Sequence, residues 1–553
     1  MASLISSTIW IRKGVAAQFP RRYDLNEQEM ERVTQMAGDR LEQVKQELAQ
    51  AQFEEEKVDI DEMIGGESDD EDNKKEEDVS DDKKVEKITD ELAEYDLETY
   101  DQETTKSVSM GVFSNVKGLQ YYDNPSDDPY VTLNDVQDDE LEREELEIYP
   151  TDSVLVSAKT QDDVSQLDVY VYDASEENFY IHHDLLLPAM PLCLEWIDFT
   201  PAGIHTDDPN RKGNFVAVGT MDPEIEIWSL DVIDGLYPDA ILGATNRQKQ
   251  ASKKKKKKKK AASNSLTAPT SLISPTHHTS SILSLSHNRM VRNLLLSSSA
   301  DTTVKLWDLN VEPMSPASTF TAIRSFDLHK DKVQSAQWNP KQPTVVLSGG
   351  WDGLIKIWDS RNCTEGVGVK VESDVECLRW DPFEDFVFLV TLDNGLIQSY
   401  DSRMLPKFGN KATDVQDRSK ALWTLSAHDS SVSALDISST IPGLMVTGGV
   451  DKMVKVWNID QKEGKPSLSM VTSRDLGVGK VFSVSFCPDE PATIAVAGSK
   501  ASVQIWDLTT NNGVRSGFRD RLKQFTNFNV DEERTVGKGG VISVADEPQS
   551  EEE

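Results

Sequence analysis

The chain of 553 residues has only four cysteines and eight histidines, and it contains no long apolar run. The cysteines form no CxxC or Cys/His pattern, so we predict neither disulfides nor a zinc site and expect a reducing compartment. No stretch approaches the roughly 18 apolar residues of a membrane span. Trp10, Arg12 and Lys13 interrupt the segment in which a secretory signal would be apolar. We therefore expect a soluble, intracellular protein.

Motifs of catalytic and nucleotide-binding sites are also missing. GVGK (Gly477–Lys480) has neither the upstream Gly nor the following Ser/Thr of a P-loop, and no nucleophile elbow is present. His182, His183 and Asp184 are adjacent on an expected strand, where neighbouring residues point to opposite faces, so the two imidazoles should not share a metal ion. We predict no enzyme, with no catalytic, cofactor or metal site and no small-molecule substrate.

Negative charge is abundant but unevenly distributed. The net charge is −38, and residues 51–150 alone contain 35 Asp and Glu against 9 Lys and Arg. Residues 57–110 are too poor in apolar side chains to fold alone. An acidic segment of this kind attracts basic proteins, so we expect basic partners. Ser68 and Ser80 directly precede acidic residues and are candidate phosphorylation sites, unless the segment is an unmodified spacer.

A helix is predicted at about residues 26–56, within the same N-terminal region. The segment lacks Pro, and apolar residues recur at spacings of three and four. They are Met30, Val33, Ala37, Leu41, Val44 and Leu48. This apolar stripe fits a helix that packs on the rest of the chain and equally fits a helix that binds a partner.

One run of positive charge lies near the middle of the chain. It consists of Lys253, Lys254, Lys255, Lys256, Lys257, Lys258, Lys259 and Lys260. A nuclear-import signal, a phosphate-binding tether for RNA and a merely solubilising run all fit this composition. Without interleaved aromatic residues, any RNA contact would be independent of sequence.

Three segments repeat one pattern, namely SSSADTTVKLWDL, SGGWDGLIKIWDS and TGGVDKMVKVWNI. In each, a Trp follows an Asp by six residues and a Ser or Thr by ten, with a His further upstream. The three sets are His278, Ser297, Asp301 and Trp307; His329, Ser348, Asp352 and Trp358; and His428, Thr447, Asp451 and Trp457. The period is that of a β-propeller blade. We interpret these sets as structural tetrads whose hydrogen bonds join neighbouring strands, because an active site is not repeated at blade period.

Four weaker copies of the same pattern bring the number of repeated units to seven. The aromatic positions of all copies are Tyr172, Trp228, Trp307, Trp358, Tyr400, Trp457 and Trp506. Seven units predict an all-β, seven-bladed β-propeller with an acidic, partly helical N-terminal insertion or arm.

Domain boundaries follow from these patterns. ISSTIWIRKG (Ile5–Gly14) is similar to the strands that open other blades, so residues 1–14 should dock into the propeller as a strand. We assign 15–150 to the acidic arm and 151–526 to the propeller. A lysine-rich disordered insert should cover about 236–274, because the step from Trp228 to Trp307 is about 35 residues too long for one blade. Residues 527–553 should form an acidic tail.

ELEIYPTDSVLVSAKTQDDVSQLDVYVYD and FYIHHDLLLPAMPLCLEW resemble the periodic tryptophan protein 1 family, a nuclear WD-repeat family. ISSTIWIRKGVA, the acidic arm and a basic insert between blades resemble it too. The resemblance implies a nucleolar factor that supports large-subunit (60S) pre-rRNA processing without catalysing it. Family links to chromatin and ribosomal gene transcription are a secondary implication.

From the residues and the resemblance together we expect a nuclear and nucleolar scaffold of ribosome biogenesis. Its partners would be pre-ribosomal RNA and assembly proteins of large-subunit precursors, with no membrane contact. A chromatin- or histone-binding regulator of ribosomal gene transcription is the alternative. WDSR (Trp358–Arg361) and YDSR (Tyr400–Arg403) also match a short pattern of WD-repeat receptors in cullin ubiquitin ligases, which leaves a substrate receptor as a third, weaker interpretation.

Overall fold

The computed structural model describes eleven stretches of the chain. They are 3–23, 30, 34, 143–144, 146–206, 208–243, 274–311, 319–408, 420–462, 465–524 and 540–544. The chain divides into two compact units. The first consists of Met1–Gln43 together with Leu146–Glu553 and contains all the strands described below, and the second is Val44–Glu145. The lysine run, Ser68, Ser80 and most of the expected helix at 26–56 lie outside the described residues.

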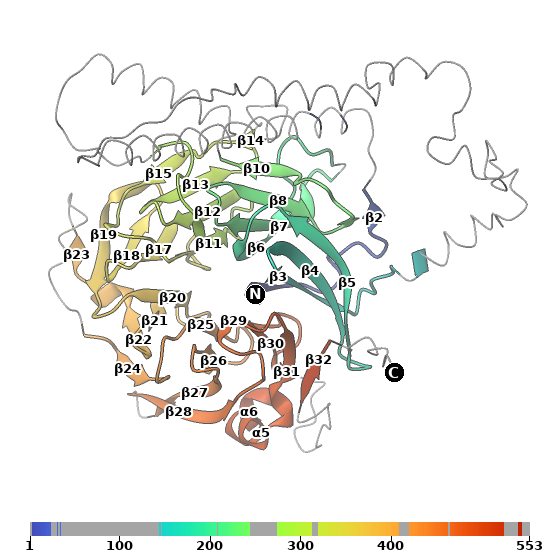
Figure 1. The fold of residues 1–553 in the computed structure, drawn as a ribbon. Coiled ribbons are helices and arrows are strands. Elements are labelled where there is room, and N and C mark those ends of the chain that lie inside the picture. Colours follow the sequence, from blue (N-terminus) through green and yellow to red (C-terminus); the bar gives the residue numbers. More distant parts are fainter. Residues whose placement is uncertain are drawn as a thin grey trace, which may run out of the picture. The chain divides into compact units, whose positions relative to one another are not determined.

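Seven antiparallel sheets are arranged as blades around a ring, which confirms the seven-bladed β-propeller (Figure 1). Blades 1 to 3, each from its inner to its outer strand, are β1 (Leu4–Ile11), β3 (Ser153–Gln161), β4 (Val164–Asp173) and β5 (Asn178–Leu187); β6 (Pro191–Phe199), β7 (Lys212–Thr220), β8 (Ile225–Ser229) and β10 (Ala240–Leu242); and β11 (Ile282–His287), β12 (Leu294–Ser299), β13 (Val304–Asp308) and β15 (Arg324–Phe326).

Blades 4 to 7 follow the same plan. They are β16 (Ser335–Trp338), β17 (Val345–Gly349), β18 (Leu354–Asp359) and β19 (Asn362–Lys370); β20 (Val375–Trp380), β21 (Val387–Leu392), β22 (Leu396–Asp401) and β24 (Trp423–Ser426); β25 (Ala434–Ile437), β26 (Leu444–Gly448), β27 (Val454–Lys462) and β28 (Lys465–Arg474); and β29 (Val481–Phe486), β30 (Thr493–Gly498), β31 (Val503–Asp507) and β32 (Val541–Ser543). Two short strands extend outer edges: β14 (Thr319–Phe320) joins blade 2, and β23 (Lys407–Phe408) joins blade 4.

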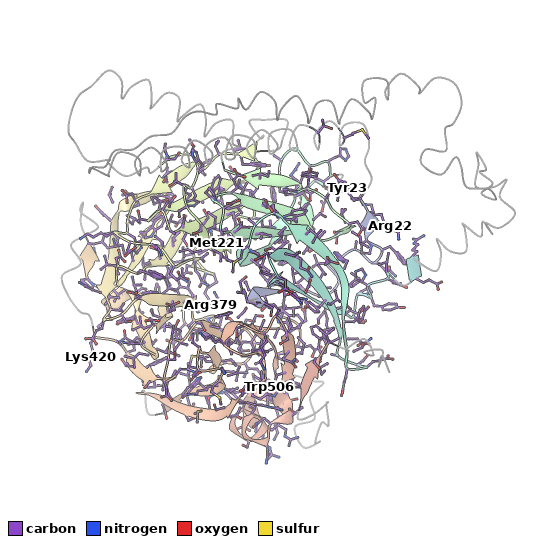
Figure 2. All side chains as sticks on the ribbon, viewed as in Figure 1. Arg22, Tyr23, Met221, Arg379, Lys420 and Trp506 are labelled. Carbon is purple, nitrogen blue, oxygen red and sulfur yellow. The ribbon has the colours of Figure 1, made fainter. Side chains whose placement is uncertain are left out.

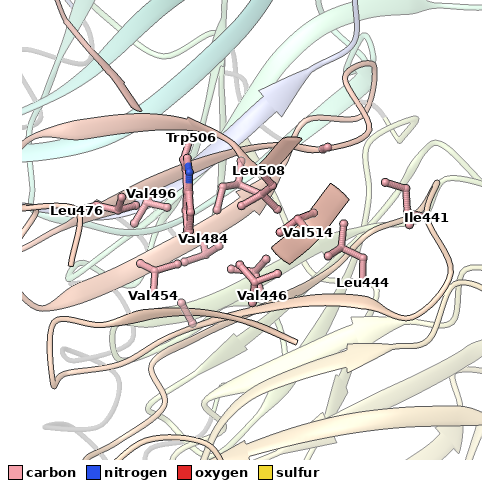
Figure 3. Close-up of a cluster of buried hydrophobic side chains, with 14 of the residues drawn as sticks. Ile441, Leu444, Val446, Val454, Leu476, Val484, Val496, Trp506, Leu508 and Val514 are labelled. Carbon is pink, nitrogen blue, oxygen red and sulfur yellow. The ribbon is translucent and has the colours of Figure 1, made fainter. Parts of the chain in front are cut away.

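The core lies between the blades and not in one central mass. Each sheet buries alternate apolar side chains against the next sheet, as half-buried strands do. Between blades 6 and 7, for example, Val446, Val484 and Val496 pack with Trp506 and Leu508 (Figure 3). A 3-10 turn, η4 (Leu508–Thr510), and the short helices α5 (Asn512–Gly517) and α6 (Arg519–Leu522) follow β31. The helices add Val514, Phe518 and Leu522 to this cluster. Another 3-10 turn, η3 (Ser402–Met404), follows β22 in blade 5.

The N-terminal strand closes the ring. β1 pairs with β3, with Trp10 opposite Leu155, and it contacts both β6 and β29, the inner strands of the two neighbouring blades. The amide of Thr8 donates to Ser483 Oγ at 3.0 Å. Blade 1 is therefore assembled from segments that lie about 140 residues apart in the sequence.

A strap of residues 12–23 follows β1 and is held against blade 2. The Ala17 amide donates to Asp231 Oδ1 at 3.0 Å, and β2 (Arg21–Arg22) pairs in parallel with β9 (Val232–Ile233). The returning chain lies beside it, because the Ile148 amide donates to the Gln18 carbonyl at 2.9 Å. Residues 15–23 and 146–150, which we had assigned to the arm, thus pack on the ring.

Two other boundaries differ from those drawn on the sequence. β10 (Ala240–Leu242) is the outer strand of blade 2, although we placed the start of the lysine-rich insert at about 236. β32 pairs with β31 and completes blade 7, although we placed the end of the propeller at 526. Both strands have three residues, which is too short for an alternating pattern to stand out in the sequence.

Candidate functional site

The three predicted tetrads are assembled in blades 3, 4 and 6. In blade 3, Trp307 Nε1 donates to Ser297 Oγ at 2.8 Å, and that hydroxyl lies 2.7 Å from His278 Nε2. His278 Nδ1 lies 2.9 Å from Asp301 Oδ2. An imidazole protonated on Nδ1 satisfies the whole chain: indole to hydroxyl, hydroxyl to imidazole, imidazole to carboxylate. The tetrad therefore connects strand β13, strand β12, the loop before β11 and the β12–β13 turn.

The other two tetrads repeat this geometry. His329 Nε2 and Trp358 Nε1 lie 3.0 and 3.2 Å from Ser348 Oγ. In blade 6, His428 Nε2 and Trp457 Nε1 lie 2.8 and 2.9 Å from Thr447 Oγ1. The remaining bonds join His329 to Asp352 at 3.1 Å and His428 to Asp451 at 2.9 Å.

Burial decides what these groups can do chemically. Ser297, Ser348 and Thr447 are all fully buried, so no substrate can reach their hydroxyls. Burial lowers the pKa of His278, and the hydrogen bond with Asp301 opposes this only in part. For Asp301, the hydrogen bonds from His278 and Thr303 outweigh the effect of burial and hold its pKa well below the usual range. A neutral imidazole beside an ionised carboxylate, sealed from solvent, acts as a structural crosslink.

A lysine that we did not predict accompanies each tetrad, and it is buried in blades 3 and 4 but only half-buried in blade 6. Lys305, Lys356 and Lys455 stand two residues before the tetrad tryptophans, and the repeated KLW, KIW and KVW could have revealed them. Lys356 donates to the Leu328 carbonyl and Lys455 to the Ala427 carbonyl at 2.7 Å. These carbonyls belong to the residues just before the tetrad histidines. Burial lowers the pKa of Lys305 and Lys356 to about 8.

The degenerate blades replace the tetrad with other contacts. In blade 5, Tyr400 Oη donates to Gln398 Oε1 at 2.8 Å. In blade 2, Trp228 Nε1 donates to Glu226 Oε2 at 3.2 Å. In blade 7, Trp506 Nε1 is buried and has no hydrogen-bond partner among the described residues.

The two adjacent histidines do not point to opposite faces, and that prediction is wrong. His183 pairs with Val169 and Ile181 with Tyr170, so His182 is the extra residue of a β-bulge in β5. The bulge brings His182 Nδ1 within 2.8 Å of His183 Nδ1. Burial, followed by the charge of His182, lowers the pKa of His183 to about 3. In the described ranges, no group of three or more His, Cys, Asp or Glu side chains is arranged to hold a metal ion.

The two arginines of WDSR and YDSR are each engaged by their own turn. Arg361 Nη2 lies 2.7 Å from Asp359 Oδ2, and Arg403 Nη2 lies 2.7 Å from Asp401 Oδ2. Both guanidinium groups are largely exposed. An adaptor that used them would have to break or share these bidentate pairs.

Comparison with known proteins identifies the repeats and the family. The model of the WD domain, G-beta repeat matches residues 270–308, 320–359 and 419–458, which contain the three tetrads. Periodic tryptophan protein 1 of Saccharomyces cerevisiae is 33% identical over 100% of this chain and 98% of its own length. The chain belongs to the periodic tryptophan protein 1 family. An uncharacterized WD repeat-containing protein of Schizosaccharomyces pombe is 41% identical over 94% of this chain and 92% of its own length.

The family assignment confirms the resemblance seen in the sequence. It extends over the whole chain, including the N-terminal region that is not made of repeats. A more distant relative is the Ribosome biogenesis protein WDR12 homolog of Trichoplax adhaerens, which is 29% identical over 32% of this chain and 37% of its own length. In the described part of the chain no helix is long and apolar enough to cross a membrane.

Proposed function

We propose that the protein is a non-enzymatic scaffold of ribosome biogenesis that acts in the nucleolus. Its propeller and lysine run would hold pre-ribosomal RNA and assembly proteins in large-subunit precursors, and its acidic segment would recruit basic proteins. One observation carries the proposal. The recurring His, Ser/Thr and Asp residues are buried crosslinks, which supports a structural and not a catalytic role for them. The similarity to the Ribosome biogenesis protein WDR12 homolog supports a role in ribosome biogenesis.

The polar architecture fits a rigid platform. Three blades are crosslinked internally by tetrads, and the ring is closed by β1. A propeller held in this way presents its loops at fixed positions, as multivalent assembly requires. The acidic and basic segments have opposite electrostatic preferences, so they are suited to different partners.

The direct test is crosslinking of the tagged full-length protein to RNA in cells, followed by sequencing of the bound RNA. We expect reads at discrete sites in large-subunit pre-rRNA. Diffuse or absent reads would contradict the RNA-holding role and would favour the alternative, a chromatin- or histone-binding regulator.

A matched pair of variants tests the contribution of the lysine run separately from that of the propeller. Replacing Lys253–Lys260 by serine should reduce nuclear accumulation or retention in pre-ribosomes, whereas replacement by arginine should preserve both, because only charge is required. If the serine variant behaves like the wild type, neither import nor RNA contact depends on these lysines.

The ubiquitin-ligase interpretation makes a different prediction for Arg361. In the scaffold role, Arg361→Ala should leave the unfolding midpoint and the co-purifying proteins unchanged, since the side chain is exposed and pairs with Asp359 of its own turn. Quantitative mass spectrometry of the purified complexes checks this. Selective loss of a cullin adaptor would instead support the receptor interpretation, with Lys370→Ala on β19 as an exposed control.

A further inference from the structure

A cavity of about 470 Å³ runs along the centre of the ring. Its lining residues come from β1, β6, β11, β16, β20, β25 and β29, the inner strands of all seven blades. The cavity is therefore the central channel of the propeller, and its volume is in the range of small-ligand sites.

Carboxylates outnumber cations among the residues that line the channel. The charged lining residues are Glu195, Glu376, Arg379 and Asp436. Arg379, which Figure 2 shows near the centre of the ring, has its Nε 3.4 Å from Asp436 Oδ1. Glu195 Oε1 lies 3.1 Å from Arg289 Nη2. Two of the three carboxylates thus face an arginine, and the third is Glu376.

Glu376 lies three residues before Arg379 on β20 and has acidic neighbours. It is the second residue of β20, beside the β21–β22 turn, where the Asp393 amide donates to the Asp374 carbonyl at 3.1 Å. Burial, together with the charges of Asp393 and Asp374, raises the pKa of Glu376 to about 7. None of the hydrogen bonds or ion pairs among the described residues involves its carboxylate. A cation placed here would relieve an unfavourable arrangement of charge.

The channel wall also offers apolar surface at the level of Glu376. The cavity is lined by Leu192 of β6, Leu283 of β11 and Phe482 of β29. Each is the second residue of its strand, as Glu376 is the second residue of β20. A long side chain with an aliphatic stem and a charged end matches this combination.

We propose that the central channel binds one arginine or lysine side chain of a basic partner polypeptide, with Glu376 as its counter-ion. The stem of that side chain would pack against Leu192, Leu283 and Phe482, and its charged end would face Glu376. This inference goes beyond the assembly role, because it places a specific basic-peptide site in the propeller and does not depend on RNA.

Fluorescence anisotropy with the full-length protein tests the site. The probes are fluorescein-labelled heptapeptides, Ser-Gly-Ala-X-Ala-Gly-Ser, in which X is Arg, Lys, Gln or Glu. We expect the Arg and Lys peptides to bind at least tenfold more tightly than the other two. Glu376→Gln should weaken binding of the Arg peptide about tenfold, as loss of a partly desolvated ion pair does.

Two further variants separate charge from shape. Gln334→Trp keeps Glu376 but fills the channel at the residue just before β16, so it should also block binding. Glu365→Gln removes an exposed carboxylate from the outer strand β19 and should leave binding unchanged. Circular dichroism establishes that all three variants are folded.

The pH dependence gives an independent readout. Asp374 and Asp393 carry charge near Glu376, and Arg379 lies further along β20. The residues just before the adjacent strands β16 and β25 are the neutral Gln334 and Ser433, which also line the channel. Between pH 8 and pH 6, protonation of Glu376 should raise the Kd of the Arg peptide about tenfold, and Glu376→Gln should abolish this dependence. Equal affinity for the Gln peptide, no binding of any peptide, an unaltered Kd in Glu376→Gln, or an equal loss in Glu365→Gln would each overturn the proposal.

Discussion

Replacing Trp10 by alanine should lower the free energy of unfolding by about 3–5 kcal/mol, the usual cost of removing a buried tryptophan. Trp10 is 6% exposed, and its Nε1 donates to the Ser485 carbonyl of blade 7 at 3.2 Å. Its ring meets Tyr172 edge-on, with centroids 6.4 Å apart. The side chain thus joins blade 1 to blade 7 at the closure of the ring, so its loss should weaken the closure as well as leave a cavity.

Urea unfolding followed by tryptophan fluorescence and by circular dichroism measures this effect. Trp351→Ala is the matched control, because Trp351 is 39% exposed and contacts Lys332 at the surface. It should cost less than about 1 kcal/mol. An unchanged unfolding midpoint for Trp10→Ala would show that β1 does not hold the ring closed in solution.

Lowering the pH from 7.5 to 5.0 should destabilise the protein, and His183 alone should account for about 2 kcal/mol of the loss. Burial holds the pKa of His183 at about 3, whereas an unfolded histidine titrates near 6.5. Below pH 6.5 the histidine therefore binds a proton in the unfolded chain but not in the folded protein. The free energy of unfolding consequently decreases as the pH is lowered. Burial also lowers the pKa values of the tetrad histidines His278, His329 and His428, so they act in the same direction.

Asp301, the acidic partner in the blade 3 tetrad, does not contribute in this pH window. The pKa of Asp301 lies below its usual range, so the stability that it provides is lost only at pH values below about 4. Chemical denaturation at several pH values gives the dependence. His183→Phe should flatten the slope by about 2 kcal/mol between pH 7.5 and 5.0, since it removes this titration. An unchanged slope in His183→Phe would contradict the role given to His183.

The blades and their tetrads were predictable because the signal is local and repeated. Within one repeat, the Ser or Thr, the Asp and the Trp are held by a single hairpin, such as β12–β13, so their spacing is the same in every copy. The alternating apolar residues of each strand follow from the pleat. Tyr172 and Tyr400 were found only because the blade period indicated where to look.

Contacts between distant segments were not predictable to the same degree. β32 is recognisable only because β31 leaves an edge for it to pair with, and the strap at residues 12–23 follows a path set by Asp231 of blade 2. The bulge at His182 shifts the register of β5 against β4, and no residue in the HHD sequence marks it.

Local patterns in the sequence were enough to predict a repeated blade-sized unit, complete tetrads in three copies, and separate acidic and basic segments. The folded structure was needed to show that β32 completes the last blade, that Lys305 and Lys356 are buried beside their tetrads, and that Glu376 lines a central channel with no ion-pair partner among the described residues. The physical reason is the range of the interactions. Periodicity and charge are properties of neighbouring residues, whereas ring closure, burial and the channel arise only when segments far apart in the chain meet.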